Sequence, residues 1–257
     1  MHIEPGLVDG TKILLSYATA TAALAYTAKL AWDMVRSNSV QALLLRSVVA
    51  TALVFAFFEV FPHHPVGVSE VHLILGTTLL LIFGAAPAAI GLAAGLLVQS
   101  LFFAPQDLPQ YGMNVTTLLV PLFATAALAR RIIPRATAYV DLSYAQTLKL
   151  SLAYQGGIVL WVGFWAIYGH GVGAENLASI GSFGAAYMTV VLLEPLIDLA
   201  VLAAADLGYN FFASLVPEIN DGISVRGVLA PLLFSDHLLG DFWSRERFLN
   251  AFVAAAY

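Results

Sequence analysis

Long runs of apolar residues, separated by short polar connections, dominate the pattern of this chain. A transmembrane helix needs about 20 predominantly apolar residues, because the hydrocarbon core of a bilayer is about 30 Å thick. Runs of this kind predict helices over residues 13–34, 39–61, 114–133, 146–169 and 182–205. The pattern therefore predicts an all-α integral membrane protein, built as a compact bundle of helices.

A further apolar stretch, residues 71–103, is too long for one ordinary span and contains Gly84-Ala85-Ala86-Pro87. Proline lacks a backbone N–H and its ring clashes with the preceding turn, so an undisturbed helix cannot run through Pro87. We expect two shorter spans joined by a tight turn. One long, kinked helix is the alternative.

The basic residues favour the first arrangement, which gives seven spans in total. All of them except Lys12 then fall on one side of the membrane: Lys29, Arg36, Arg46, Arg130, Arg131, Arg135, Lys149, Arg226, Arg245 and Arg247. The positive-inside rule makes that side cytoplasmic. A six-span arrangement would place the basic cluster over 130–149 outside. The sequence therefore predicts seven transmembrane helices with the N-terminus outside and the C-terminus inside.

Composition excludes several classes of protein. The 257 residues are 60% hydrophobic and only 11% charged, which excludes a water-soluble globule. The absence of cysteine excludes disulfides and thiolate metal sites. The sequence carries no P-loop, no basic nucleic-acid patch and no hydrolase motif. We therefore expect no nucleic-acid partner, and we expect neither enzymatic activity nor ATP hydrolysis by this chain.

The chain opens with Met1-His2-Ile3-Glu4-Pro5-Gly6, which lacks the basic region and the cleavage site of a signal peptide. A retained start would bring together three nitrogens: the α-amine of Met1, the backbone amide of His2 and the His2 imidazole. These nitrogens can close two chelate rings around one ion, and such a set suits Ni(II), Cu(II) or Co(II). The competing interpretation is that His2 is the second residue of a frayed terminus.

Four histidines lie near predicted outer edges of the membrane and could complete such a site: His63, His64, His72 and His170. His63 and His64 stand in a loop bounded by prolines, whereas His72 opens the third predicted span. Each of them taken alone is more typical of a hydrogen-bonded interfacial histidine than of a metal ligand.

Polar residues inside the predicted spans need partners, because the bilayer core offers them no water. Gln99 and Asn114 flank the same predicted outer loop, so they could support one site by orienting its ligands. Hydrogen bonding between helices is an equally good explanation. The acidic residues Glu59, Glu194 and Asp198 also lie in apolar surroundings and are functional candidates by default.

Four short motifs follow one another in order along the first half of the chain: Met1-His2-Ile3, Ser69…His72-Leu73…Gly76, Gln99…Phe102 and Gly112-x-Asn114. Together they resemble the metal-binding (S) subunits of cobalt and nickel energy-coupling factor transporters, the CbiM/NikM family. The resemblance covers roughly residues 1–130 and extends weakly through the seventh span.

This resemblance implies a role for the N-terminus. In that family the N-terminal loop plugs the bundle, and a transported Co(II) or Ni(II) ion is held by residues matching Met1, His2 and His72. Ser69, Gln99 and Asn114 would then orient these ligands. The resemblance also implies the bacterial cytoplasmic (inner) membrane as the location. Its implied partners are a transmembrane coupling subunit and cytoplasmic ATPases.

Two departures from the family pattern affect the site. Pro5 follows Glu4, where the family has Glu followed directly by Gly, and the spacing from Ser69 to His72 is one residue longer. His63 or His64 could therefore replace His72, and cobalt cannot be distinguished from nickel.

We divide the chain into a metal-chelating segment (1–12), a helix bundle (13–205) and a tail (206–257). Apolar residues at helical spacing in the tail suggest an amphipathic helix at the cytoplasmic face or the membrane interface.

The tail matches no part of the family pattern, which leaves a second hypothesis open. The chain could be a non-transporting structural or assembly subunit of a larger membrane complex. A membrane metalloenzyme is disfavoured, because no general acid or base accompanies the histidines.

Overall fold

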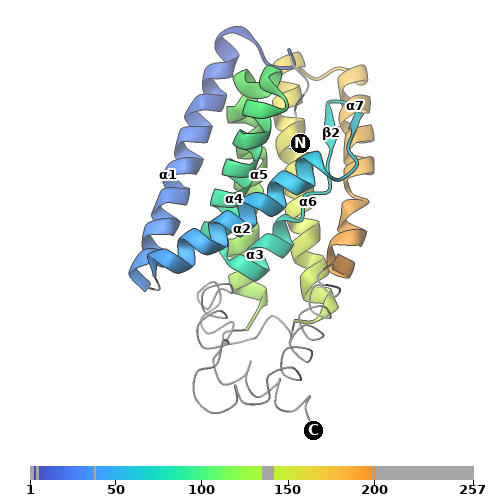
Figure 1. Ribbon diagram of the computed structural model, residues 1–257. Coiled ribbons are helices and arrows are strands. Elements are labelled where there is room, and N and C mark those ends of the chain that lie inside the picture. Colours follow the sequence, from blue (N-terminus) through green and yellow to red (C-terminus); the bar gives the residue numbers. More distant parts are fainter. Residues whose placement is uncertain (1–2, 4–5, 38, 135–141, 198–199, 201–257) are drawn as a thin grey trace, which may run out of the picture.

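A computed structural model describes residues 3, 6–37, 39–134, 142–197 and 200. Its elements in chain order are a short 3-10 helix η1 (Gly10–Lys12), α1 (Ile13–Ser37), α2 (Val40–Glu59), β1 (His64–Val66), β2 (Ser69–Val71), α3 (Gly76–Phe83), α4 (Ala85–Phe102), a 3-10 helix η2 (Pro105–Gln110), α5 (Tyr111–Ile132), α6 (Tyr144–His170) and α7 (Ala174–Tyr187). Figure 1 shows the helices as a bundle, with α2 crossing it obliquely.

The prediction of an all-α membrane bundle is confirmed, and the described residues contain seven α-helices. Five helical stretches of the described residues are long and apolar enough to cross a membrane: Val40–Glu59, Ala85–Phe102, Pro105–Ile132, Tyr144–His170 and Ala174–Ile197. The helix α1 has 25 residues and is also long enough, but it carries more polar side chains. The helix α3 has only 8 residues, so it rises by about 12 Å and cannot cross the bilayer alone.

The predicted break in the stretch 71–103 occurs at Gly84, three residues before Pro87. Gly84 ends α3 and precedes α4 with a φ of 88°, a left-handed conformation that glycine adopts without strain. Pro87 lies in the first turn of α4, where its missing N–H costs no hydrogen bond. The alternative of one long, kinked helix is therefore wrong.

Two boundaries differ from the sequence prediction. The loop before α3 contains a short antiparallel hairpin, in which β1 pairs with β2 and the turn uses Gly67 at φ 62°. The last helix begins at Ala174 rather than at residue 182. Its first turns are polar and look like a loop in sequence. However, Asn176 donates hydrogen bonds to the carbonyls of Ala166 and Gly171, which ties the end of α6 to the start of α7.

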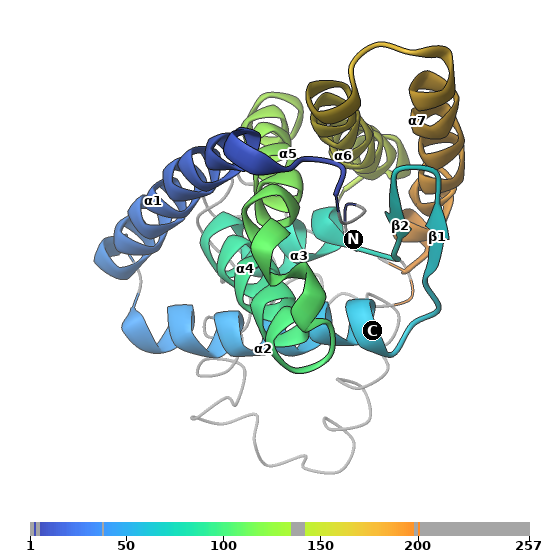
Figure 2. The ribbon, with the colours of Figure 1, turned by 90° about the horizontal axis from the view of Figure 1, so that it is seen from above.

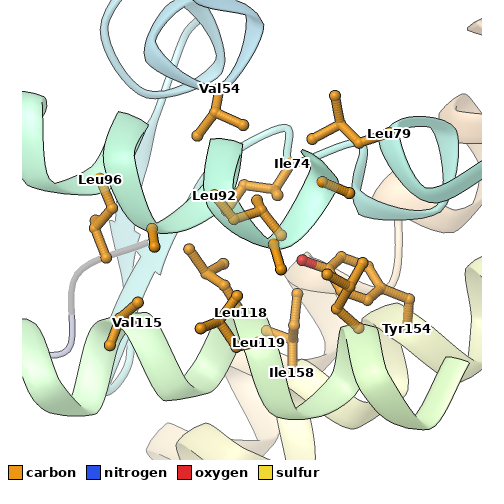
Figure 3. Packing of buried hydrophobic residues seen from close by; sticks show 14 of the residues in the cluster. Val54, Ile74, Leu79, Leu92, Leu96, Val115, Leu118, Leu119, Tyr154 and Ile158 are labelled. Atoms are coloured by element: carbon orange, nitrogen blue, oxygen red, sulfur yellow. The ribbon is translucent and has the colours of Figure 1, made fainter. Parts of the chain in front are cut away.

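The helices α2 and α4 approach closely, and small residues in the α4 segment Gly91-Leu92-Ala93-Ala94-Gly95 make room for this contact. A Cβ added at Gly91 would lie 2.5 Å from the Cβ of Ala50, and one at Gly95 would lie 2.6 Å from Cγ1 of Val54. Around this contact the core is filled by large apolar side chains (Figure 3), with Val54, Leu92, Leu96, Val115, Leu118, Leu119 and Ile158 among them.

The bundle has two chemically different ends. The end of α1, the start of α2, the end of α5 and the start of α6 lie together at one end (Figure 1), and Arg36, Arg130, Arg131 and Lys149 belong to these termini. The hairpin, η2 and the connection from α6 to α7 lie at the opposite end. This separation of charge follows the sequence pattern. The membrane side that each end faces remains a prediction of the positive-inside rule.

Candidate metal site

The segment before α1 turns inward and enters the middle of the bundle (Figure 2). Ile3 is fully buried there. It forms an isolated antiparallel bridge with Ser69, and its N–H donates a hydrogen bond of 3.0 Å to Oδ1 of Asn114 on α5. The N-terminal segment therefore extends the hairpin into the bundle and is anchored to α5.

Gln110, at the end of η2, anchors the same segment a second time. With its amide oriented to suit its neighbours, Nε2 donates to the carbonyl of Ile3 at 2.6 Å. The amide oxygen accepts from the N–H of Gly6 at 3.2 Å. The N–H and the carbonyl of buried Ile3 are thereby both satisfied, as a backbone removed from water requires.

Residues further along the segment pack on the end of α6. Leu7 and Val8 are buried, and a Cβ at Gly169 would lie only 1.8 Å from the carbonyl oxygen of Leu7. The ammonium of Lys12 donates to the carbonyls of Tyr168 and Gly169, at 3.1 and 3.0 Å. Lys12 thus complements the last carbonyls of α6. This contact accounts for a basic residue at the end of the bundle where sequence predicts none.

His72 follows β2 directly, three residues after Ser69, the bridge partner of Ile3. The prediction that His72 opens the third span is wrong, because α3 begins only at Gly76.

The side chain of His72 is 1% exposed, and its Nε2 is 3.0 Å from a carboxylate oxygen of Glu70. The ring packs edge-on against Phe58, with centroids 5.0 Å apart, and stacks on His63, with centroids 4.8 Å apart and planes at 17°. His72 is therefore a buried imidazole with a carboxylate on one ring nitrogen.

The other candidate histidines lie in less enclosed positions. His63 is exposed but covers one face of the His72 ring. His64 is exposed on β1, opposite Val71, and His170 is exposed at the end of α6. The structure thus brings one loop histidine to His72 and keeps the other two on the surface.

The predicted supporting residues separate into two groups. Ser69 and Asn114 both contact Ile3 directly, one through the backbone bridge and the other through its side-chain oxygen. Gln99 is buried near the end of α4, and its Oε1 has no hydrogen-bond partner among the described residues.

The ligand set itself is only partly described. Met1 and His2 lie outside the residues that the structure describes. Within the described residues, no group of three or more histidine or acidic side chains is arranged to hold a metal ion.

Three contributors to this region were not predicted from sequence. Gln110 and Lys12 anchor the N-terminal segment, and Glu70 is paired with His72. Lys12 could have been singled out from the sequence, because it is the one basic residue on the predicted outer side of the membrane. Gln110 gave none, because a glutamine in a proline-containing loop has no distinctive spacing.

Comparison with known proteins gives a consistent result. Residues 2–206 match the family described as the cobalt uptake substrate-specific transmembrane region, CbiM. No protein of curated function matches the chain significantly. A solved structure described as a truncated transition metal transporter shares the fold with a TM-score of 0.56 and 17% identity. The match covers 79% of this chain and 97% of that one.

The family match extends well beyond the first half of the chain, where the motifs lie, and spans the whole bundle. The chain therefore belongs to the CbiM family of cobalt uptake transmembrane proteins.

Proposed function

We propose that this chain is the substrate-capture subunit of an energy-coupling factor importer and that it binds Co(II) or Ni(II) as its transported substrate. The observation that carries the proposal is the insertion of the N-terminal segment, with fully buried Ile3 bridged to Ser69 three residues before His72. A frayed terminus would leave Ile3 in water.

Covalent geometry supports ligation by the two residues before Ile3. Consecutive Cα atoms are 3.80 Å apart, so the Cα of Met1 lies within about 7.6 Å of that of Ile3. An antiparallel bridge to Ser69 directs the chain, toward its start, along the same path that runs from Ser69 to His72. We therefore propose that the Met1 amine, the His2 amide and the His2 imidazole bind the same ion as the His72 ring.

The chemistry of this set suits a borderline transition metal. Two amine or amide nitrogens and two imidazoles form a nitrogen-only, near-planar site, which favours Ni(II), Cu(II) or Co(II) over Mg²⁺ and Ca²⁺. The Glu70 carboxylate pairs with Nε2 of His72 and orients the ring, so we propose Nδ1 as the nitrogen that binds the metal. Asn114 and Gln110 hold the inserted backbone in place, so the chelate is presented at a fixed position.

His72 is preferred to the two loop histidines as the fourth ligand because it is buried and lies three residues after Ser69, the bridge partner of Ile3. His63 stacks on the ring of His72 and shields it from solvent, and His64 is exposed on β1.

We propose a transmembrane coupling subunit and cytoplasmic ATPases as the partners of this chain, as the resemblance to energy-coupling factor transporters implies. The sequence of this chain carries no P-loop of its own. The prediction that the N-terminus is outside puts the capture site on the side from which a bacterial cell takes up metal across its cytoplasmic membrane.

Histidine substitutions test the proposal. Ni(II) binding is measured by calorimetry on detergent-solubilised full chain with an unmodified N-terminus. The variant His72→Ala should bind about 10–100-fold more weakly, since even loss of a partner that only orients a ligand has that effect. His64→Ala is the matched control and should bind like the wild type.

Two results would contradict the assignment. Normal binding by His72→Ala together with loss of binding by His63→Ala would move the fourth ligand to the loop. A wild-type chain that carries and binds no metal would favour the non-transporting assembly subunit.

A further inference from the structure

A buried carboxylate outside the candidate metal site carries a further inference. Glu194 is fully buried, in the helical residues 190–197 that follow α7. One carboxylate oxygen accepts from the N–H of Thr77 at 2.7 Å and from that of Thr78 at 3.2 Å. The other accepts from the hydroxyl of Ser151 at 2.5 Å and from Nε2 of Gln155 at 3.4 Å.

These contacts make Glu194 the cap of α3. The N-cap residue of α3 is Leu75, whose side chain cannot accept a hydrogen bond, so the first N–H groups of the helix need an external acceptor. A carboxylate supplies that acceptor and also carries the charge that the positive end of a helix dipole favours. Gly76 packs against the ring of Tyr154, which leaves no space for a side chain at this turn.

The same cluster reaches the backbone that carries His72. Nε2 of Gln155 donates to the carbonyl of Ile74 at 2.9 Å in addition to its contact with Glu194. The N–H of Ile74 in turn donates to the carbonyl of His72 at 3.0 Å. The four residues from His72 to Leu75 are therefore fixed by β2 at one end and by the Glu194 cluster at the other.

We propose that Glu194, through Gln155 and the start of α3, is a positioning residue for the metal-binding imidazole of His72. This inference rests on the proposed function. It adds that metal affinity depends on a contact between α6, the residues after α7 and the half-length helix α3. Three hydrogen bonds in series connect Glu194 to the backbone carbonyl of His72, through Gln155 and Ile74.

A carboxylate suits this cluster because three of its four described partners are N–H groups that only donate: the backbone amides of Thr77 and Thr78, and Nε2 of Gln155. Glutamine at position 194 would retain one acceptor oxygen for Thr77 and Thr78 but would present its NH₂ group to Nε2 of Gln155, a second donor. The near-isosteric change Glu194→Gln therefore disrupts the cluster without leaving a cavity.

A double-mutant cycle tests the proposal by Ni(II) calorimetry on the full chain with an unmodified N-terminus. Glu194→Gln should weaken binding about tenfold, in the range typical of residues that orient a ligand. In the His72→Ala background the same change should have less than about a twofold effect, because Glu194 acts through His72. Glu175→Gln, an exposed glutamate on α7, is the matched control and should change nothing.

Two further measurements keep the test decisive. Electron paramagnetic resonance of bound Cu(II) should show one fewer coordinated nitrogen, or a weaker coupling, in Glu194→Gln, which a general loss of stability would not produce. If Glu194→Gln does not fold, Gln155→Met removes the link to Ile74 and should still lower affinity only when His72 is present.

The outcomes separate this inference from the proposed function. Equal effects of Glu194→Gln with and without His72, or no effect at all, would overturn the positioning role while metal binding stands. A wild-type chain without metal affinity would overturn the proposed function itself.

Discussion

Gly169 offers a direct test of the inserted N-terminal segment. A Cβ at this position would lie 1.8 Å from the carbonyl oxygen of Leu7, whereas an ordinary contact is 3.4–4 Å. The obstacle is backbone rather than a flexible side chain, so Gly169→Ala must displace the segment or the end of α6 by about 1.6–2.2 Å, the difference between 1.8 Å and 3.4–4 Å. Overpacking of this kind typically costs about 1–3 kcal/mol.

The cost should appear in metal affinity more than in the stability of the bundle. Residues before α1 can leave the bundle without breaking any helix, which relieves the clash but also withdraws the predicted Met1 and His2 ligands. With tenfold in affinity for every 1.4 kcal/mol, the expected loss of Ni(II) affinity is about 5–150-fold. The bundle itself should gain slightly, since alanine is favoured over glycine in a helix by about 1 kcal/mol.

The matched control is Gly156→Ala, on the same helix α6. A Cβ there meets nothing within 4 Å, so this variant carries the helix-propensity gain without the clash. The assay is Ni(II) calorimetry together with thermal unfolding of both variants in detergent. Wild-type affinity in Gly169→Ala would refute the argument that insertion of the segment creates the site.

Two further predictions follow from the same geometry. Asn114→Leu removes the acceptor for the buried N–H of Ile3, and an unsatisfied buried donor costs about 1–3 kcal/mol. Ni(II) affinity should therefore fall by up to about 100-fold. Unchanged affinity would show that this hydrogen bond does not hold the segment. In a chain without native cysteine, His64→Cys should react with an impermeant thiol reagent added to intact cells, whereas Arg131→Cys should not; the reverse pattern would invert the predicted topology.

Periodicity was sufficient to predict the long helices of the bundle. Apolar runs of membrane length predicted the long helices, and Pro87 with Gly84 predicted the division between α3 and α4. These features are local in sequence. A helix in a bilayer satisfies its own backbone, so its apolar residues alone identify it.

The hairpin and the start of α7 could not be predicted in the same way. Each strand has only three residues, and β1 includes Pro65, which disfavours a strand assignment. The first turns of α7 are polar, and their helical start is tied to α6 by Asn176, a contact across the connection that periodicity does not reveal.

The candidate site was predicted in part. Asn114 was singled out because an amide at membrane depth needs a partner, and the structure pairs it with Ile3. The stacking of His63 on His72 and the anchoring of Ile3 by Gln110 depend on how three separate segments meet. No spacing along the chain reveals such a meeting.

The measurement that tests the central claim most directly is Ni(II) affinity with one glycine added before Met1. The added residue converts the α-amine into a peptide amide and displaces the amine from its chelate ring. The account predicts a loss of at least about 10–100-fold, the range for loss of a partner that only orients a ligand. The same glycine added after Tyr257 should leave affinity unchanged. Undiminished affinity with the N-terminal addition would contradict ligation by the terminal amine.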